Sequence, residues 1–144
     1  MRDVRRYSLA EVDSGRGTSR LVRDGKALDF TVEGLLLEAQ FELDDGSCLV
    51  WLTQDCPFEE LLSVYLVGRE GQLLDALSAG VPYTPGLLSI RAVGPLWVEF
   101  SFFGDAPYRL QIEPRARFRR WLPLGWRYYR WLARHRLMVN KLRP

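Results

Sequence analysis

Residues Leu35 to Leu52 have the sequence LLLEAQFELDDGSCLVWL. Between Leu35 and Leu43 every odd position is apolar, and this period of two is typical of a half-buried β-strand. The pair Asp45-Gly46 supplies the positive φ angles that a type I′ hairpin turn requires. With that turn, Phe41 faces Val50, and the apolar side chains of both strands share one face. The sequence therefore predicts an antiparallel hairpin in this register.

Segments with the same alternation follow at short intervals along the chain, and they are residues 61–67, 73–77, 88–92, 96–102 and 108–112. An earlier strand is expected around Leu21-Val22, with a turn at Asp24-Gly25. Short strands joined by hairpin turns are typical of a β-sandwich or an open barrel. We expect a mainly β fold, an antiparallel β-sandwich or open barrel of about seven strands, in a domain spanning residues 20–114.

The composition is that of an ordinary globular protein of 144 residues, with 47% hydrophobic and 26% charged residues. A chain of this length buries enough apolar surface to fold as one domain without disulfides or metals. Residues 1–19 are polar, and we expect a flexible N-terminal arm there. No apolar run approaches the about 20 residues of a transmembrane helix, and no signal sequence is recognised. Cys48 and Cys56 are the only cysteines, so we expect free thiols and a cytoplasmic location.

The net charge of +2 conceals a strong asymmetry along the chain. Residues 27–113 contain three arginines against fourteen acidic residues, a net charge of −11. Residues 114–144 contain nine arginines, one lysine and no acidic residue, a net charge of +10. An acidic body thus precedes a basic C-terminal segment, residues 115–144, and such a charge block points to an interaction surface.

The basic C-terminal segment is also rich in aromatic residues. Pro114 is expected to end the last strand, because proline cannot donate to a sheet ladder. From about Leu124 onward the residues are good or neutral helix formers. At helical spacing a set of mainly apolar side chains falls in one sector, namely residues 124, 128, 131, 132, 135, 138, 139 and 142. We expect a C-terminal α-helix that either covers the side of the sheet carrying Trp51 and Trp97 or projects as a binding arm.

Neither a nucleophile motif nor a metal motif stands out. His135 is the only histidine, and no catalytic sequence context accompanies it, so we expect a packed or partly exposed structural histidine. Cys48, Cys56 and His135 lack a fourth ligand and a recognised spacing for a metal site. We therefore expect no catalytic residues, no metal and no cofactor.

Two pairs of adjacent acidic residues, Asp44-Asp45 and Glu59-Glu60, invite an acid/base interpretation. Neighbouring residues in a strand point to opposite faces, so neither pair is suited to act as an acid/base dyad. We expect a protein that is not an enzyme. An enzymatic alternative would require an acidic cleft around Asp55, Glu59 and Glu60.

Exposed arginines and aromatic side chains are the candidate binding residues. The expected contacts to an anionic partner are Arg115, Arg117, Arg119, Arg120, Arg127, Arg130 and Arg134. Arginine favours bidentate pairing and stacking on rings. Trp121 and Trp126 are the expected aromatic anchors, together with Tyr83 in the loop of residues 80–86, which two prolines stiffen. That loop has the alternative role of closing one end of the domain.

Several partners fit a basic, aromatic segment. We expect a small interaction module whose basic C-terminal segment contacts an acidic surface, either its own body, a partner protein or a nucleic acid. The alternative is a peripheral membrane protein, with residues 115–142 forming a basic amphipathic helix on an anionic membrane surface.

Overall fold

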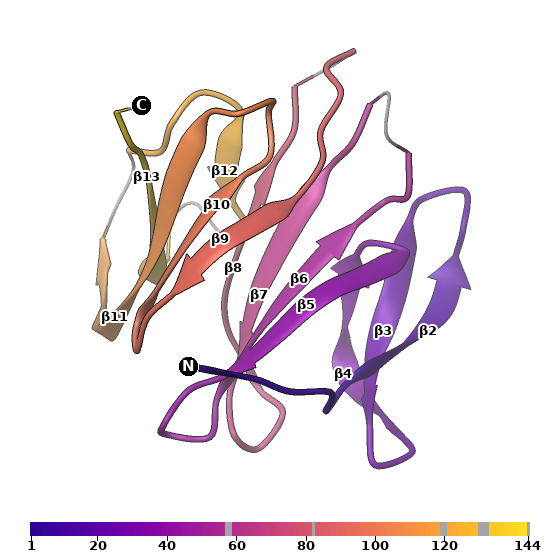
Figure 1. Ribbon diagram of the computed structural model, residues 1–144. Coiled ribbons are helices and arrows are strands. Elements are labelled where there is room, and N and C mark those ends of the chain that lie inside the picture. Colours follow the sequence, from indigo (N-terminus) through magenta and orange to yellow (C-terminus); the bar gives the residue numbers. More distant parts are fainter. Residues whose placement is uncertain (57–58, 82, 119–120, 130–132, 144) are drawn as a thin grey trace.

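The computed structural model describes residues 1–143 except residues 57–58, 82, 119–120 and 130–132. Within these residues the strands form three antiparallel sheets (Figure 1), and there is no helix. No described segment therefore has the length and apolar character of a membrane-crossing helix. The strands are β1 (Arg2–Asp3), β2 (Ser8–Asp13), β3 (Thr18–Arg23), β4 (Lys26–Glu33), β5 (Leu36–Glu42), β6 (Cys48–Thr53), β7 (Leu62–Val67), β8 (Leu73–Ala79), β9 (Ser89–Val93), β10 (Trp97–Ser101), β11 (Pro107–Phe118), β12 (Trp126–Tyr128) and β13 (Arg134–Lys141).

The largest sheet lies between the other two. This central sheet has the order β1-β5-β6-β7-β8-β12. The C-terminal sheet, β13-β11-β10-β9, packs on one face, and the N-terminal sheet, β2-β3-β4, packs on the other. Every residue of β6 and β7 is buried, as expected for strands covered on both sides. The predicted mainly antiparallel β fold is confirmed, and the sheets are not closed into a barrel.

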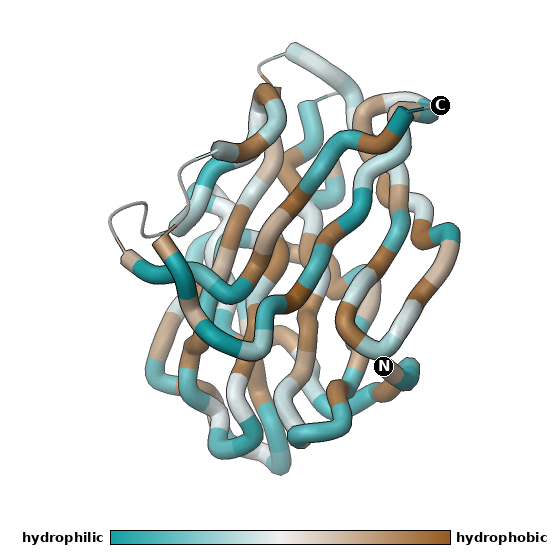
Figure 2. The backbone as a smooth tube through the Cα atoms, turned by 90° about the vertical axis from the view of Figure 1, so that its left-hand side faces the viewer, coloured by the Kyte–Doolittle hydropathy of each residue, from teal (hydrophilic) through white to brown (hydrophobic). Residues whose placement is uncertain are grey.

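Two apolar cores result from this layering. In the larger core, Trp51 of the central sheet meets Phe100 of the C-terminal sheet edge to face, with ring centroids 4.9 Å apart. The smaller core lies beneath the N-terminal sheet and includes Val50, Leu21 and Val32. Alternate residues of β6 therefore enter different cores. Figure 2 shows the corresponding alternation of hydrophilic and hydrophobic residues along many of the strands.

Strands β5 and β6 form the predicted hairpin, but the predicted register is wrong by one residue. Phe41 pairs with Leu49, one position earlier than expected. The carboxylate of Asp45 accepts hydrogen bonds from the backbone N–H and the hydroxyl of Ser47, and Gly46 has a φ of 85°. These features belong to a longer loop, a type I turn that ends in a left-handed glycine, rather than to a type I′ turn.

Residues 1–19 were expected to form a flexible arm, but strands β1 and β2 and the start of β3 lie in this range. The first of these strands pairs with β5 and the second with β3. The turn expected at Asp24-Gly25 is present, with φ angles of 53° and 77° that suit a type I′ turn. Tyr7 and Leu21 are buried between the N-terminal sheet and the central sheet. The mostly polar N-terminal residues therefore cover one face of the central sheet.

The predicted C-terminal helix is wrong, because the described residues from Leu124 onward form β12 and β13. In β13 the side chains of His135, Leu137 and Val139 are buried, while the residues between them are more exposed. This is the period of a strand, and it lets β13 cover the larger core while pairing with β11. The described residues within 115–142 likewise form none of the amphipathic helix that the membrane-surface alternative assumed.

The strand β11 passes through Pro114 and ends at Phe118, so the predicted strand end at this proline is wrong. The pairing of β11 with β13 is irregular between Ile112 and Arg117. A proline is tolerated at such an irregularity, because no ladder hydrogen bond is required from its nitrogen. Beyond the irregularity, Phe118 pairs with Arg134. The extension of β11 thus places basic and aromatic residues on a paired strand.

Candidate functional site

The described arginines of the expected binding set lie on three strands of the sandwich. They are Arg115 and Arg117 in β11, Arg127 in β12 and Arg134 in β13, and all of them are exposed. Arg119, Arg120 and Arg130 lie outside the described residues. The backbones of Arg117, Arg127 and Arg134 are held by strand pairing, whereas Arg115 lies in the irregular stretch between Ile112 and Arg117.

Phe118 was not among the expected anchors, yet it stands beside these arginines. Its side chain is 69% exposed. The guanidinium of Arg134 lies over its ring, 5.5 Å from the centroid, which is a cation–π contact. The alternation Arg115-Ala116-Arg117-Phe118 is the signal in the sequence, since it suggests a strand that continues past Pro114.

The three expected aromatic anchors have different surroundings. Trp121 is 92% exposed and Tyr83 is 89% exposed. Tyr83 also has a φ of 58°, an uncommon left-handed conformation for a tyrosine. Trp126 instead lies in the larger core, with its ring 5.7 Å from Phe100 and 5.5 Å from Tyr108. Trp126 is therefore not available to a partner.

The described arginines of the basic C-terminal segment form few direct contacts with the acidic body. Among the described residues, no arginine of this segment forms an ion pair with a carboxylate. Some carboxylates of the body already have other partners, since Glu42 pairs with Arg2 and Arg6, and Glu99 pairs with Arg109. The hydrogen bond from Arg2 holds the pKa of Glu42 below its ordinary value of 4.5.

The acidic residues of the loop after β6 do not form an acid/base pair. Glu60 is buried, and its carboxylate accepts hydrogen bonds from the backbone N–H groups of Gln54, Cys56 and Leu61. This carboxylate therefore holds the loop together. Glu59 is exposed, and its Oε1 accepts a 3.4 Å hydrogen bond from the backbone N–H of Tyr83 in the loop after β8. The two carboxylates have different surroundings and different contacts.

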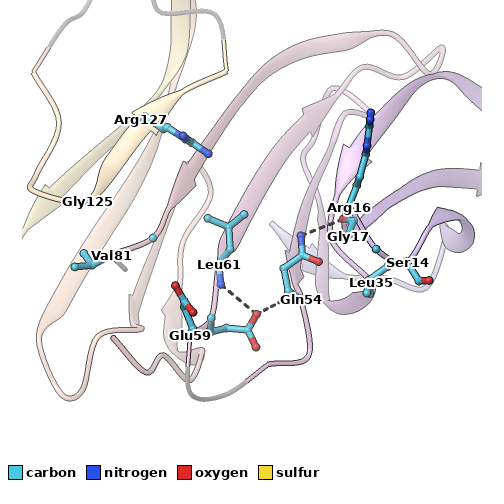
Figure 3. Close-up of a pocket in the computed structure, with 13 residues that line it drawn as sticks. Ser14, Arg16, Gly17, Leu35, Gln54, Glu59, Leu61, Val81, Gly125 and Arg127 are labelled. Carbon is cyan, nitrogen blue, oxygen red and sulfur yellow. Dashed lines mark hydrogen bonds between the residues drawn. The ribbon is translucent and has the colours of Figure 1, made fainter. Parts of the chain in front are cut away.

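A cleft of about 830 Å³ lies at one end of the central sheet, where β6 and β8 end and β5, β7 and β12 begin. One wall is the loop between β2 and β3, which carries Arg16, and the opposite wall is formed by Val81, Gly125 and Arg127 (Figure 3). Leu61 lies between the walls, with Gln54 beside it. The side-chain amide of Gln54 donates a 3.0 Å hydrogen bond to the backbone of the β2–β3 loop. This bond fixes one wall of the cleft to the central sheet.

His135 is a fully buried residue, in agreement with the expected structural histidine. Its Nδ1 lies 3.0 Å from Oδ1 of Asp75, and its ring stacks on Tyr128 with centroids 3.5 Å apart. Cys48 and Cys56 are free thiols. In the part of the chain that the structure describes, no cluster of three or more residues could hold a metal ion.

No protein-family model, no curated protein and no solved structure matches this chain.

Proposed function

We propose that this protein is a non-enzymatic interaction module that binds an acidic partner, protein or nucleic acid, through the exposed arginines of its C-terminal strands. One observation carries the proposal. Arg115, Arg117, Arg127 and Arg134 are exposed and have no carboxylate partner among the described residues, and the exposed ring of Phe118 lies beside them. Arginines without a carboxylate partner attract anionic groups, which they bind in bidentate geometry.

The partner is expected to be another molecule rather than the acidic body. The strands β12 and β13 belong to the sandwich, so this segment already packs on the rest of the chain. Among the described residues, none of its arginines forms an ion pair with a carboxylate of the body. A surface patch that carries only positive charge speeds the encounter with an oppositely charged partner, and the effect declines as salt is added.

The test is a pair of double charge reversals with equal changes in net charge. The first, Arg115→Glu with Arg117→Glu, alters the proposed surface. The control, Arg5→Glu with Arg20→Glu, alters exposed arginines of the N-terminal region. Binding to poly-glutamate and to a single-stranded oligonucleotide is measured by fluorescence anisotropy at several salt concentrations.

We expect the wild-type protein to bind at least one probe in low salt. The first variant should lose about tenfold or more in affinity, because two charge-assisted contacts are replaced by repulsion. The control should retain affinity. Equal losses in both variants, or no binding of either probe by the wild type, would contradict the proposal. The probe that binds more tightly identifies the class of partner.

A further inference from the structure

The cleft beside β12 has a chemistry of its own. Its volume of about 830 Å³ lies within the range of about 300–1,000 Å³ that is common for ligand sites. We propose that this cleft binds an extended acidic peptide segment, with one side-chain carboxylate at Arg127 and another at Arg16 on the opposite wall. The proposal rests on the proposed function for the acidic character of the partner, and it adds the kind of segment that is recognised.

Arg127 is the main anchor in this cleft. Its Nε donates a 3.2 Å hydrogen bond to Oγ of Ser78 on the neighbouring strand β8. This bond orients the guanidinium, and neither Nη group has a hydrogen-bond partner among the described residues. In Figure 3 the side chain reaches from its own wall toward the cleft. A guanidinium that is fixed through Nε and free at both Nη groups presents two donors to a carboxylate.

Arg16 supplies positive charge from the opposite wall (Figure 3). Among the described residues its only ion pair joins its Nε to Oδ2 of Asp13 at the long distance of 3.8 Å, and its side chain is 85% exposed. Such a solvated pair contributes little and exchanges readily for another anion. Arg16 can thus pair with one carboxylate of a bound segment while Arg127 pairs with another.

The remaining lining favours a peptide over a nucleic acid. Leu35, Leu61 and Val81 are partly buried side chains that provide apolar contact next to the arginines. Two carboxylates line the same cleft, the exposed Glu59 and the buried Glu60, which already accepts three backbone hydrogen bonds. They repel a run of phosphates, and Glu59 can also accept a hydrogen bond from a peptide N–H. None of the described lining residues is aromatic, so the described walls offer no ring on which a base could stack. Isolated carboxylates next to apolar side chains match this arrangement.

The experiment uses the full chain and a labelled peptide of alternating leucine and glutamate. The matching peptide of leucine and glutamine tests the need for the carboxylate. Arg127→Gln and Arg16→Gln remove the two cationic walls separately. Arg91→Gln is the control, because Arg91 is an exposed arginine on β9 of another sheet. The thermal midpoint of each variant is measured alongside fluorescence anisotropy.

We expect Arg127→Gln and Arg16→Gln each to weaken binding of the glutamate peptide by roughly tenfold, as is typical when a charge-assisted contact is lost. The control and the wild type should bind alike, and the glutamine peptide should bind poorly to both. Wild-type affinity in Arg127→Gln and Arg16→Gln would overturn the cleft assignment, and so would stronger binding of an oligonucleotide at this site. Because Arg16 lies in an exposed loop, its variant should fold even if Arg127→Gln does not.

The Arg115→Gln/Arg117→Gln double variant distinguishes binding in the cleft from binding to the exposed arginines of the C-terminal strands. If it binds the glutamate peptide normally while the cleft variants do not, the cleft is the peptide site. If only the double variant loses affinity, the exposed strand surface binds the acidic partner and the cleft proposal is wrong.

Discussion

Oδ1 of Asp75 in β8 lies 3.0 Å from Nδ1 of His135 in β13, so that one carboxylate joins the central sheet to the C-terminal sheet. Its other oxygen accepts hydrogen bonds from the backbone N–H groups of Arg136 and Leu137, at 2.8 and 2.9 Å. Tyr128 of β12 stacks on the histidine, and its hydroxyl donates to the carbonyl of Leu137. This edge of the sandwich is thus closed by a buried polar cluster.

The first prediction is that Asp75→Asn destabilises the fold. The amide keeps the shape of the carboxylate but replaces one acceptor oxygen with a donor, so a backbone N–H or the histidine loses its partner. Breaking a buried pair in this way costs on the order of 3 kcal/mol. Urea denaturation measures the loss, and Asp105→Asn, at an exposed turn position, is the control. Equal stabilities of the two variants would show that the cluster does not join the sheets.

The second prediction concerns the larger core. Phe100 is fully buried and contacts the rings of Trp51, Tyr108 and Trp126. Replacing it with alanine leaves a cavity that close-packed neighbours cannot fill, and we expect a loss of about 3–5 kcal/mol in the free energy of unfolding. The same change at Phe118, which is 69% exposed, should cost less than about 0.5 kcal/mol. Comparable losses at both positions would contradict the assigned core.

Much of the β structure could be predicted because even short strands show the alternation of apolar and polar residues in the sequence. The strands β7, β8, β9 and β10 lie close to the expected segments. Phe41 and Val50, which the predicted hairpin places on one apolar face, are both buried. Alternation alone did not reveal that Val50 belongs to a second core, because both faces of its strand are covered.

The errors have identifiable physical causes. The register between Phe41 and Leu49 depends on contacts of Asp45 within the loop, which compete with the type I′ turn that the same residues also suit. The C-terminal residues have acceptable helix propensity, but pairing with β11 and burial in the core overrode it. For the candidate sites, the sequence indicated the exposed arginines. A cleft was suggested only by the enzymatic alternative around Asp55, Glu59 and Glu60, of which Glu59 and Glu60 line the cleft observed. Its other walls could not be predicted, because they come from loops that meet only in the folded chain.

The third prediction concerns the thiols. Cys48 is buried, and desolvation raises the pKa of its thiol to about 12, so almost no reactive thiolate forms near neutral pH. Cys56 is exposed. A thiol reagent such as DTNB should therefore modify Cys56 alone in the native protein and both cysteines in urea. The variant Cys56→Ser should not react until it unfolds. Rapid reaction of this variant under native conditions would refute the burial of Cys48.

The fourth prediction concerns acid stability. The pKa of Glu42 lies below its ordinary value of 4.5, chiefly because of the hydrogen bond from Arg2 and with help from the charge of Arg6, while burial opposes the shift. A group with a lowered folded-state pKa stabilises the fold above its unfolded-state value, and this contribution is lost as the pH falls through the folded-state value. Glu42→Gln should therefore be less stable than the wild type at neutral pH.

The stabilities of Glu42→Gln and the wild type should converge as the pH falls below about 4.5, the ordinary pKa of this carboxyl. Urea midpoints measured across this range test the prediction. Glu70→Gln, at an exposed turn, is the control and should follow the wild type. A constant difference between Glu42→Gln and the wild type at every pH would indicate that lost packing, not the charge, explains the effect.

The last prediction concerns a chain that ends at Glu113. It lacks β12, β13 and the end of β11, and it has a net charge of −8. The larger core loses side chains from both of its sheets, among them Trp126, Leu137 and Val139. Asp75 also loses its partner in the C-terminal sheet.

We expect this chain to unfold or aggregate, because a large apolar face becomes exposed and a buried carboxylate is left without its contacts. A chain that ends at Lys141 keeps β13 and should remain folded, which excludes a general effect of shortening. Circular dichroism melts and size-exclusion chromatography distinguish the two chains. A monomeric chain ending at Glu113 that melts cooperatively at the wild-type temperature would show that the basic C-terminal segment is an appendage, not a structural part of the sandwich.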